Sequence, residues 1–529
     1  MSEPVLIPPT TTRAPNGMVC SIDPLASAAG VAMLRVGGSA ADAAVAASAV
    51  LVVTSQHLCG MGGDLFALVH HTDGSPPATL NASGRAGSGA DADRLRREGY
   101  AAMPFRDDIR SVTVPGCVDG WVALHGRFGR LPLGDVLAPA IGYAREGFPA
   151  APTLVAAFAR VADLADSADY TAAGPVEVGR AVCRPGVART LEAIAGEGRD
   201  AFYQGEFGQG LLALGRGEYV PSDLARPLAD WIDPIVVRAW GHDVWTVPPN
   251  SQGYLTLAGA WMAGGLDLLS DPSDSRWAHL LVEVAKQAGY DRPAVLHEGA
   301  DGVGLLARER LGPRRAAVGE TAASLGAPVS AGDTIYLCAV DGDGGAASLI
   351  QSNASGWGSH LVEPATRIFL HNRGVGFSLD AGHPAEYGPG RRPPHTLSPA
   401  LVTKPDGSLR ATVGTMGGDA QPQVLLQLLA RLFHAGQAPG DALAAGRWRL
   451  GVAGSTGFDT WSRPEALRVE IEGHAAGWDD DLRRRGHTVH RTASHDSAFG
   501  HAHVIVRDDD GMLHGAADHR SQGGAAHGW

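Results

Sequence analysis

The chain contains little cysteine, and its cysteines form no pattern. Five occur among 529 residues, scattered and without a CxxC pair, which predicts neither a disulfide framework nor a thiolate metal site. A basic N-terminal region followed by an apolar run is absent, as is any stretch of about 18 uncharged apolar residues. These absences favour a reducing compartment, and we expect a cytoplasmic protein with no membrane partner.

Positive charge and the common catalytic signatures are also scarce. The formal net charge of −13 argues against nucleic acid as a partner and favours a small-molecule substrate. The sequence has no HExxH, GxSxG or GxxxxGKS/T motif, which excludes the usual zincin, esterase and P-loop interpretations. Histidines are common near the C-terminus, but their spacing is not that of a metal site. We therefore predict no metal and no cofactor.

Hydrophobic residues make up 44% of the chain, which is enough for a large core. An alanine-rich run, 40–53, predicts a buried helix that Ser39 caps. Residues 130–230 also read as mostly helical, and the segment Arg276–Tyr290 reads as an amphipathic helix. By contrast, residues 294–333 are expected to form a poorly structured connector.

After this connector the sequence favours strands. Alternating β-branched segments around one helical run predict strands there at Thr334–Val340, Ala346–Gln351, Leu409–Val413 and Val504–Arg507, and a helix at Pro422–His434. One further strand, Leu65–His70, is predicted before the connector, directly after a glycine-rich turn. Since both halves of the chain contain helices and strands, we expect one interleaved core rather than two separate domains.

Two of these strands flank an Asp/Gly-rich turn and predict a hairpin. With Asp343 at the centre of the turn, Val340 faces Ala346 and Thr334 faces Ser352. Directly opposed Cβ atoms lie about 4.5–5.5 Å apart, so the two hydroxyl groups can form a hydrogen bond.

A threonine hydroxyl becomes a good nucleophile when a base takes its proton, and the residue's own α-amine can be that base. Such an amine titrates at about pH 7.7–8.0, which suits catalysis near neutral pH. The amine is free only if the bond between Asp333 and Thr334 is cut. The alternative is structural, because a threonine at the start of a strand is often only a good β-former.

Sequence blocks along nearly the whole chain resemble the γ-glutamyltranspeptidase family and occur in its order. They are GGSAADAAVAA (37–47), GMGGDLFALV (60–69), VPGCVDGW (114–121), GRLPLGDVLAPAIGYAREGFP (129–149), PPNSQG (248–253), GDTIYLCAVDGDG (332–344), SLIQSN (348–353), RPPHTLSPALV (392–402), GTMGGDAQPQ (414–423) and GAADHR (515–520).

The resemblance implies an α+β fold, the four-layer αββα sandwich of N-terminal-nucleophile hydrolases. It also implies a precursor that cuts itself between Asp333 and Thr334. The products would be a large subunit, residues 1–333, and a small subunit, residues 334–529, interleaved in one core. The mature protein would be a heterodimer of these subunits or a dimer of such heterodimers.

Carried over by position, the resemblance makes Thr334 the nucleophile and Ser352 a hydroxyl residue that supports it. Gly417 and Gly418 match the glycine pair whose backbone N–H groups form the oxyanion hole, where glycine permits close approach to developing negative charge. Without the family match, GTMGG would read equally well as a simple loop.

The chain departs from the family where γ-glutamyl enzymes hold the amino-acid end of their substrate. Ser83 replaces the arginine for the α-carboxylate, Gly376 replaces the acidic residue for the α-amine, and His395 and Thr396 replace a serine pair. These replacements resemble the branch that includes oxamate amidohydrolase and cephalosporin-acylase-like proteins.

The candidate substrate-binding residues are therefore Arg85, Arg373, His395 and Thr396. Arg85 can grip a carboxylate with two hydrogen bonds, or it can be paired structurally. Arg373 or His395 can compensate for the missing clamp, although His395 can equally fill space near the site.

These patterns predict a self-cleaving N-terminal-threonine amidohydrolase or acyltransferase. It would act through an acyl-enzyme on γ-glutamyl or related short acyl amides. The alternative is a non-catalytic, uncleaved relative that serves as a binding protein.

Overall fold

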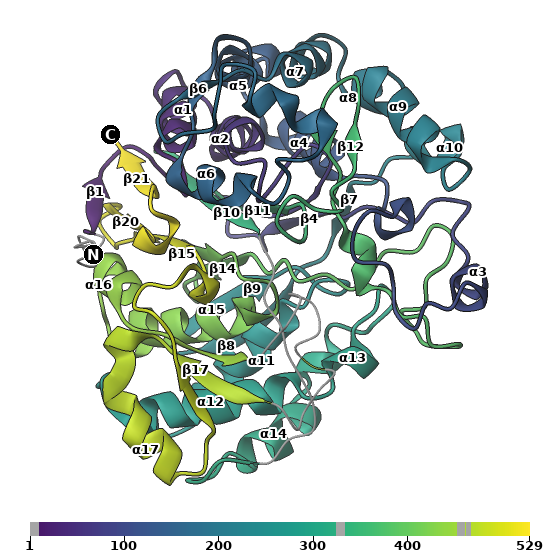
Figure 1. Cartoon of the computed structure of the whole chain (residues 1–529). Coiled ribbons are helices and arrows are strands. Elements are labelled where there is room, and N and C mark those ends of the chain that lie inside the picture. The colour runs from purple at the N-terminus through teal and green to yellow at the C-terminus, as the bar shows by residue number, and fades with distance from the viewer. Residues whose placement is uncertain (1–9, 324–333, 452–460, 462–466) are drawn as a thin grey trace.

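The computed structural model describes residues 10–323, 334–451, 461 and 467–529. Within them, two antiparallel sheets of seven strands each lie face to face at the centre of the molecule (Figure 1). No helix in these ranges is long and apolar enough to cross a membrane.

The strand order of both sheets follows from the backbone pairing. The first sheet has the order β21 (Ala525–Gly528), β2 (Met18–Ser21), β10 (Ile335–Val340), β11 (Ala346–Ser352), β3 (Asp64–His70), β4 (Ala78–Ala82), β7 (Asp230–Ile232). The second has the order β1 (Thr12–Ala14), β20 (Leu513–Ala517), β19 (Ala502–Arg507), β15 (Leu409–Thr415), β14 (Ala400–Thr403), β9 (His242–Thr246), β8 (Ile235–Ala239).

Each sheet combines strands from before and after residue 334. In the first sheet, β10 lies between β2 and β11, and β11 pairs in turn with β3. In the second sheet, β14 pairs with β9 on one side and with β15 on the other. The two halves of the chain therefore form one interleaved core, as the sequence predicts.

Helices cover the outer faces of both sheets, so that the layers follow the predicted order αββα (Figure 1). Over the first sheet lie α1 (Pro24–Arg35), α2 (Ala40–Thr54), α4 (Cys117–Phe128) and α5 (Leu133–Glu146). Over the second lie α11 (Tyr254–Ala263), α12 (Ser275–Gly289) and α15 (Gln421–Leu429). Apolar clusters fill the space between the sheets and beneath each helical layer.

Helix α2 shows how the local sequence sets up this packing. The Ser39 hydroxyl accepts the Asp42 N–H at 3.1 Å, while the Asp42 carboxylate accepts the Ser39 N–H at 2.8 Å. This reciprocal capping box fixes the start of the helix where the sequence predicts it. Every residue of α2 is buried, and its small alanine side chains let it pack between the first sheet and the neighbouring helices.

The remaining elements surround this core. The other helices are α3 (Ala92–Arg97), α6 (Pro152–Phe158), α7 (Pro185–Glu197), α8 (Arg199–Tyr203), α9 (Glu206–Gly215), α10 (Pro221–Ala225), α13 (Arg292–Val295), α14 (Arg308–Ala316), α16 (Pro439–Ala444) and α17 (Asp479–Arg484). The other strands are β5 (Phe148–Pro149), β6 (Ala181–Val182), β12 (Val362–Glu363), β13 (Ile368–Phe369), β16 (Trp448–Gly451), β17 (Arg468–Ile471) and β18 (Val489–Arg491).

Most of the predicted elements are confirmed, but the connector at 294–333 is wrong in part. Helix α14 lies inside it, and residues 324–333 lie outside the described ranges. The sequence pattern did not predict this helix, because it is rich in arginine, contains Pro313 and has few apolar side chains. It forms by packing Leu311 against α11 and α12 rather than through a continuous apolar stripe.

The predicted hairpin register is confirmed. Ile335 pairs with Gln351, and Val340 pairs with Ala346, which are the partners expected for a turn centred on Asp343. This register carries the chain so that residues 334 and 352 reach the same end of the first sheet.

Candidate active site

Two hydroxyl groups meet at that end of the hairpin. Thr334 stands directly before β10, and Ser352 is the last residue of β11. The Thr334 Oγ1 and Ser352 Oγ atoms are 3.1 Å apart, and both side chains are fully buried. The Ala354 N–H also donates to Ser352 Oγ at 2.8 Å. The predicted hydroxyl contact is confirmed, whereas Asp333, on the other side of the predicted cleavage site, lies outside the described residues.

A buried guanidinium adjoins this pair. Arg373 donates through Nη2 to Ser352 Oγ at 3.4 Å and through Nη1 to Thr396 Oγ1 at 3.0 Å. Burial lowers the pKa of Arg373 to about 10, although the nearby Asp64 and Asp419 carboxylates act in the opposite direction. Arg373 therefore stays charged at neutral pH and places positive charge beside the two hydroxyls.

Asp64 supplies negative charge on the same side of the sheet, directly across from Ser352 in the β3–β11 pair. Its carboxylate accepts the Gly84 N–H at 2.8 Å and lies 3.0 Å from His395 Nε2. Burial by itself raises the pKa of Asp64, but His371, His395 and Arg373 outweigh burial and lower it to about 2. Asp64 is consequently ionised in the folded protein.

His395 is held as a neutral ring. Its Nδ1 accepts the Leu397 N–H at 3.3 Å, so that Nε2 carries the proton and donates to Asp64. The ring also packs edge-on against Phe66, with centroids 4.8 Å apart. Burial, reinforced by the charge of Arg373, lowers the pKa of His395 to about 3. Of its two predicted roles, this geometry favours packing and support of Asp64.

The glycine pair Gly417 and Gly418 occupies the turn between β15 and α15. Both have positive φ, +130° and +54°, which side-chain-bearing residues rarely adopt. Within the described residues, neither N–H group donates a hydrogen bond to another group. Gln252 Nε2 ties this turn to the hairpin site, because it donates to the carbonyls of Gly418 at 2.9 Å and of Thr396 at 3.0 Å. Hydrogen bonds thus run continuously from Thr334 to the glycine turn.

A buried ion pair supports the turn from behind. Arg447 donates to the carbonyls of Phe499 at 2.9 Å and Gly500 at 3.1 Å, and its Nη2 lies 2.6 Å from an Asp518 carboxylate oxygen. Gly500 packs against the turn, since a Cβ added to Gly417 would lie 3.7 Å from the Gly500 Cα. Asp518 belongs to the GAADHR block, to which the sequence assigned no role.

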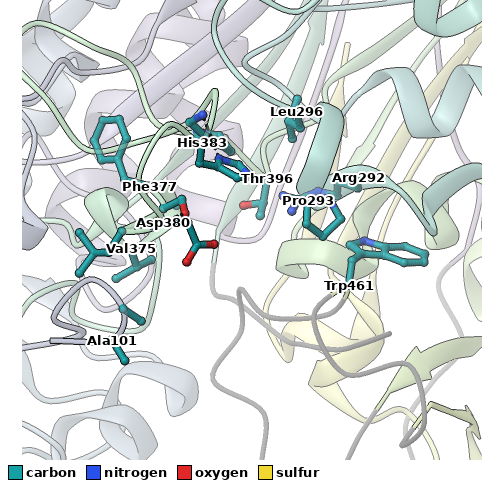
Figure 2. Close-up of a pocket in the computed structure, with 16 residues that line it drawn as sticks. Ala101, Arg292, Pro293, Leu296, Val375, Phe377, Asp380, His383, Thr396 and Trp461 are labelled. Atoms are coloured by element: carbon teal, nitrogen blue, oxygen red, sulfur yellow. Dashed lines mark hydrogen bonds between the residues drawn. The ribbon is translucent and has the colours of Figure 1, made fainter. Parts of the chain in front are cut away.

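A cavity of about 320 Å³ opens beside these groups (Figure 2). Thr396 and Gly376 line it and connect it to the hydrogen-bonded site. Figure 2 shows Arg292 on one side of the cavity, Asp380 and His383 on the other, and Thr396 between them. Charged groups of both signs therefore face a space large enough for a small acyl group.

Not every predicted substrate-binding residue reaches this cavity. Thr396 lines it, whereas Arg373 and His395 lie behind its wall. Arg85 is engaged elsewhere, with Nη1 at 2.6 Å from Glu298 and Nη2 at 3.4 Å from Asp230. The structural alternative for Arg85, an internal ion pair, is the one its contacts support.

Sequence reasoning also missed residues of the site. Gln252 and Asp64 lie in blocks that matched the family, PPNSQG and GMGGD, but the match assigned no function to either residue. Arg292 and Asp380 belong to no block, and they meet at the cavity only through the folding of distant segments.

Two groups of described residues bring three potential metal-binding atoms within 4.8 Å of one another: His279, Glu283 and His487, and Glu472, His474 and His495. Both carboxylates already pair with cations of the protein. Lys286 Nζ lies 2.7 Å from Glu283, and the Arg520 guanidinium contacts Glu472 at 2.5 Å. We therefore interpret both groups as structural ion-pair networks.

Comparison with known proteins identifies the family. The sequence profile of the gamma-glutamyltranspeptidase family matches residues 26–528. The chain belongs to the γ-glutamyltranspeptidase family. The glutathione hydrolase-like YwrD proenzyme of Bacillus subtilis is 36% identical over 96% of this chain and 98% of the relative. The oxamate amidohydrolase proenzyme of Klebsiella pneumoniae is 35% identical over 97% of this chain and 98% of the relative.

Solved structures agree with this assignment. The cephalosporin acylase from Bacillus halodurans superposes with a TM-score of 0.90 and 34% identity, covering 100% of this chain and 98% of the acylase. The protein therefore has the N-terminal-nucleophile hydrolase fold of the family, and the predicted αββα architecture is confirmed.

The neutral state of His395 predicts how stability depends on pH. An unfolded histidine has a pKa of 6.5, and the folded ring has a pKa of about 3, so between these values the unfolded chain binds more protons. The stability linked to His395 is therefore present above pH 6.5 and is lost as the pH falls toward 3. Protonation linked to His395 should therefore lower the free energy of unfolding by about 2 kcal/mol between pH 7 and pH 5.

Urea unfolding at pH 7 and pH 5 checks this. His395→Gln keeps a donor for Asp64 but does not titrate. In this variant, the difference in the free energy of unfolding between pH 7 and pH 5 should shrink by about 2 kcal/mol. The exposed His490→Gln serves as the control and should leave the difference unchanged. An unaltered pH dependence in His395→Gln would show that the ring is already charged in the folded protein.

Proposed function

We propose that the chain is a self-cleaving N-terminal-threonine amidohydrolase or acyltransferase acting on short acyl amides, the γ-glutamyl group and its relatives among them. The observation that carries this proposal is the buried contact between Thr334 and Ser352 at the start of β10. Family membership supports it, because relatives carry the names glutathione hydrolase, oxamate amidohydrolase and acylase, many of them as proenzymes.

In the proposed maturation, the Thr334 hydroxyl adds to the carbonyl carbon of Asp333. The carbon–nitrogen bond then breaks as the nitrogen takes up a proton, which leaves an ester between the two residues and a free Thr334 amine. Water opens the ester, releasing the Asp333 carboxylate and restoring the hydroxyl. Residues 1–333 and 334–529 would stay together as a heterodimer, since each sheet contains hydrogen-bonded strands from both pieces.

In the proposed catalytic cycle, the freed α-amine takes the proton of the Thr334 hydroxyl as it attacks the substrate amide. The leaving amine departs with a proton, and the acyl group remains on Thr334 as an ester. Water or an acceptor amine then removes it. The N–H donors of Arg373 and Ala354 on Ser352 place positive potential beside the nucleophile before the reaction begins.

Gly417 and Gly418 are the proposed oxyanion hole. Their N–H groups have no acceptor among the described residues, and Gln252 links their turn to the nucleophile's hydrogen-bond chain. The turn also immediately precedes α15, whose N-terminal end adds positive potential.

The cavity bears on the choice of acyl group. Gly376, which replaces the family's amine-binding acid, has no room for a side chain, because an added Cβ would lie 2.4 Å from the Pro394 carbonyl oxygen. Ser83, which replaces the family's arginine, is buried and accepts a hydrogen bond from Asn250. Both contacts argue against an amino-acid clamp at these two positions, and we propose an acyl group with a carboxylate but no α-amine.

The first test of this function concerns the nucleophile. Thr334→Ala should leave a single chain of 529 residues without turnover, because it removes the hydroxyl needed for both cleavage and catalysis. Thr334→Ser, which keeps a hydroxyl, should still cleave. Intact-mass analysis together with an amide-hydrolysis assay measures both. Full activity of a wholly uncut wild-type chain would refute self-cleavage and the amine base together.

The second test concerns the oxyanion hole. Gly417→Ala should lower kcat by about 10²–10³-fold, because alanine avoids φ near +130° and the turn must rotate its N–H away. Space is not the reason, since the nearest atom to the added Cβ is 3.7 Å away. Gly436→Ala, at another positive-φ glycine with open space around it, is the matched control. A cleaved, folded Gly417→Ala enzyme with normal kcat would remove this assignment.

The third test concerns the substrate. Glutaryl p-nitroanilide should have a higher kcat/KM than γ-glutamyl p-nitroanilide, which differs only by carrying the α-amine. Losing a charge-assisted contact costs about 1.5–3 kcal/mol, or roughly one to two orders of magnitude in affinity. A kcat/KM measurement resolves a difference of that size. A strong preference for the γ-glutamyl compound would mean that another group in the cavity, such as Asp380, recognises the amine.

A further inference from the structure

Arg431 is a buried cation without a carboxylate partner. Only 5% of its surface is exposed, and within the described residues it forms no ion pair. Its Nη1 donates to Gln437 Oε1 at 3.2 Å and its Nη2 donates to the Gly446 carbonyl at 3.4 Å. The guanidinium also lies 4.9 Å from the centroid of the Trp277 ring. Because a buried charge is costly unless an opposite charge receives it, Arg431 lacks the counter-charge that its burial requires.

The buried charges around Arg431 increase this requirement. Burial, reinforced by the charges of Arg447 and Arg520, lowers the pKa of Arg431 to about 10, so it stays charged at neutral pH. Arg447 and Arg520 share two buried carboxylates, those of Asp518 and Glu472. Three buried arginines thus meet two buried carboxylates. Among these described residues, Arg431 carries the positive charge in excess.

A cavity of about 280 Å³ opens onto Arg431. Its wall is formed by the π-helical turn η6 (Ala430–His434), the segment after α16, the 3-10 helix η8 (Gly473–Trp478) and the segment before α12. No residue lines both this cavity and the cavity beside Thr396. The two spaces are therefore separate, and a ligand of one would not occupy the other.

Two side chains of this cavity keep donors available. The Arg431 Nε has no hydrogen-bond partner among the described residues and, in contrast to the Arg292 Nε, is not closed to solvent. Gln437 lines the same cavity and accepts from Arg431 through Oε1, while its amide nitrogen donates to no described residue. A charged donor and a neutral donor therefore stand next to each other in the wall.

Among the described residues, Asp271 carries the carboxylate that faces this cavity. The residue is exposed, and its Oδ1 accepts the N–H of Ser273 at 2.8 Å and the Ser273 hydroxyl at 2.7 Å. Of the groups that shift the pKa of Arg431, Asp271 has the weakest effect. Water screens an exposed charge, so Asp271 does not neutralise Arg431.

We propose that this cavity is a binding site for a small oxyanion, whose oxygen atoms accept hydrogen bonds from Arg431 and Gln437. A planar guanidinium presents its donors as a fork that matches two oxygens of a carboxylate or of a phosphate. The ligand class is therefore a small carboxylate or inorganic phosphate. The bound anion supplies the counter-charge that the described residues do not provide.

The position of the site relates it to the glycine turn. The turn directly precedes α15, and η6 directly follows α15. Gly446, which accepts from Arg431, directly precedes Arg447, the residue that supports the turn from behind. An anion bound to Arg431 thus acts as a counter-ion for the segment that supports the turn. It also stabilises the folded protein, because it binds the folded state and not the unfolded chain.

Calorimetry with the purified full-length protein tests the site. At constant ionic strength, inorganic phosphate or glutarate should bind to the wild type. Arg431→Gln should weaken that binding by about 10–100-fold, because it removes a charge-assisted contact. The control is Arg238→Gln, whose side chain is 55% exposed, and it should leave the affinity unchanged. The probe that binds more tightly identifies the ligand as a phosphate or a carboxylate. Binding of neither probe, or equal affinity in Arg431→Gln and the wild type, would overturn the proposal.

A second variant tests the site in the opposite direction. Asp271→Asn keeps an acceptor for Ser273 but removes the negative charge that faces the cavity, so it should tighten phosphate binding by about 2–5-fold. Misfolding cannot produce a gain of this kind, which keeps the test decisive if Arg431→Gln fails to fold. Unchanged or weaker binding in Asp271→Asn would show that the anion binds elsewhere. None of these measurements requires amide hydrolysis, so their outcome is independent of the proposed function.

Discussion

The site depends on a buried guanidinium that must be neutralised. Arg373 is 1% exposed, and moving a charge into such a place is costly unless opposite charges and hydrogen-bond acceptors receive it. Asp64 and Asp419 supply the charge, and Thr396 and Ser352 supply acceptors. These groups come from four separate stretches of the chain. Satisfying Arg373 therefore brings together the hairpin, the β3 strand and the glycine turn in one arrangement.

The same arrangement explains how the fold tolerates a break in the chain. Thr334 stands outside the β10–β11 ladder, which begins at Ile335. A cut before Thr334 would leave the pairing of β10 with β2 and β11 untouched. The buried contacts that hold the two pieces together are hydrogen-bonded ladders and apolar clusters, and neither requires the peptide bond at that position.

Two glycines without side chains and one histidine without charge determine the form of the site. Gly376 leaves the cavity wall open where a side chain would collide with the Pro394 carbonyl. Gly417 allows a backbone angle at which its N–H has no acceptor among the residues that the structure describes. His395, kept neutral by burial, supports the Asp64 carboxylate without adding a charge of its own. The guanidinium groups of Arg373 and Arg292, which are both at least nine-tenths buried, then act where little water screens their charge.

The sequence by itself determined the features that depend on neighbouring residues. The Ser39 cap, the buried alanine helix and the hairpin register that brings the Thr334 and Ser352 hydroxyls together all follow from periodicity and turn chemistry within about twenty residues. The tertiary structure decided which charged groups meet, because the partner of an arginine is the acidic group that folding places within contact distance. Folding placed Arg85 against Glu298 and Arg292 at the cavity beside Asp419, and no local pattern distinguishes these two arginines.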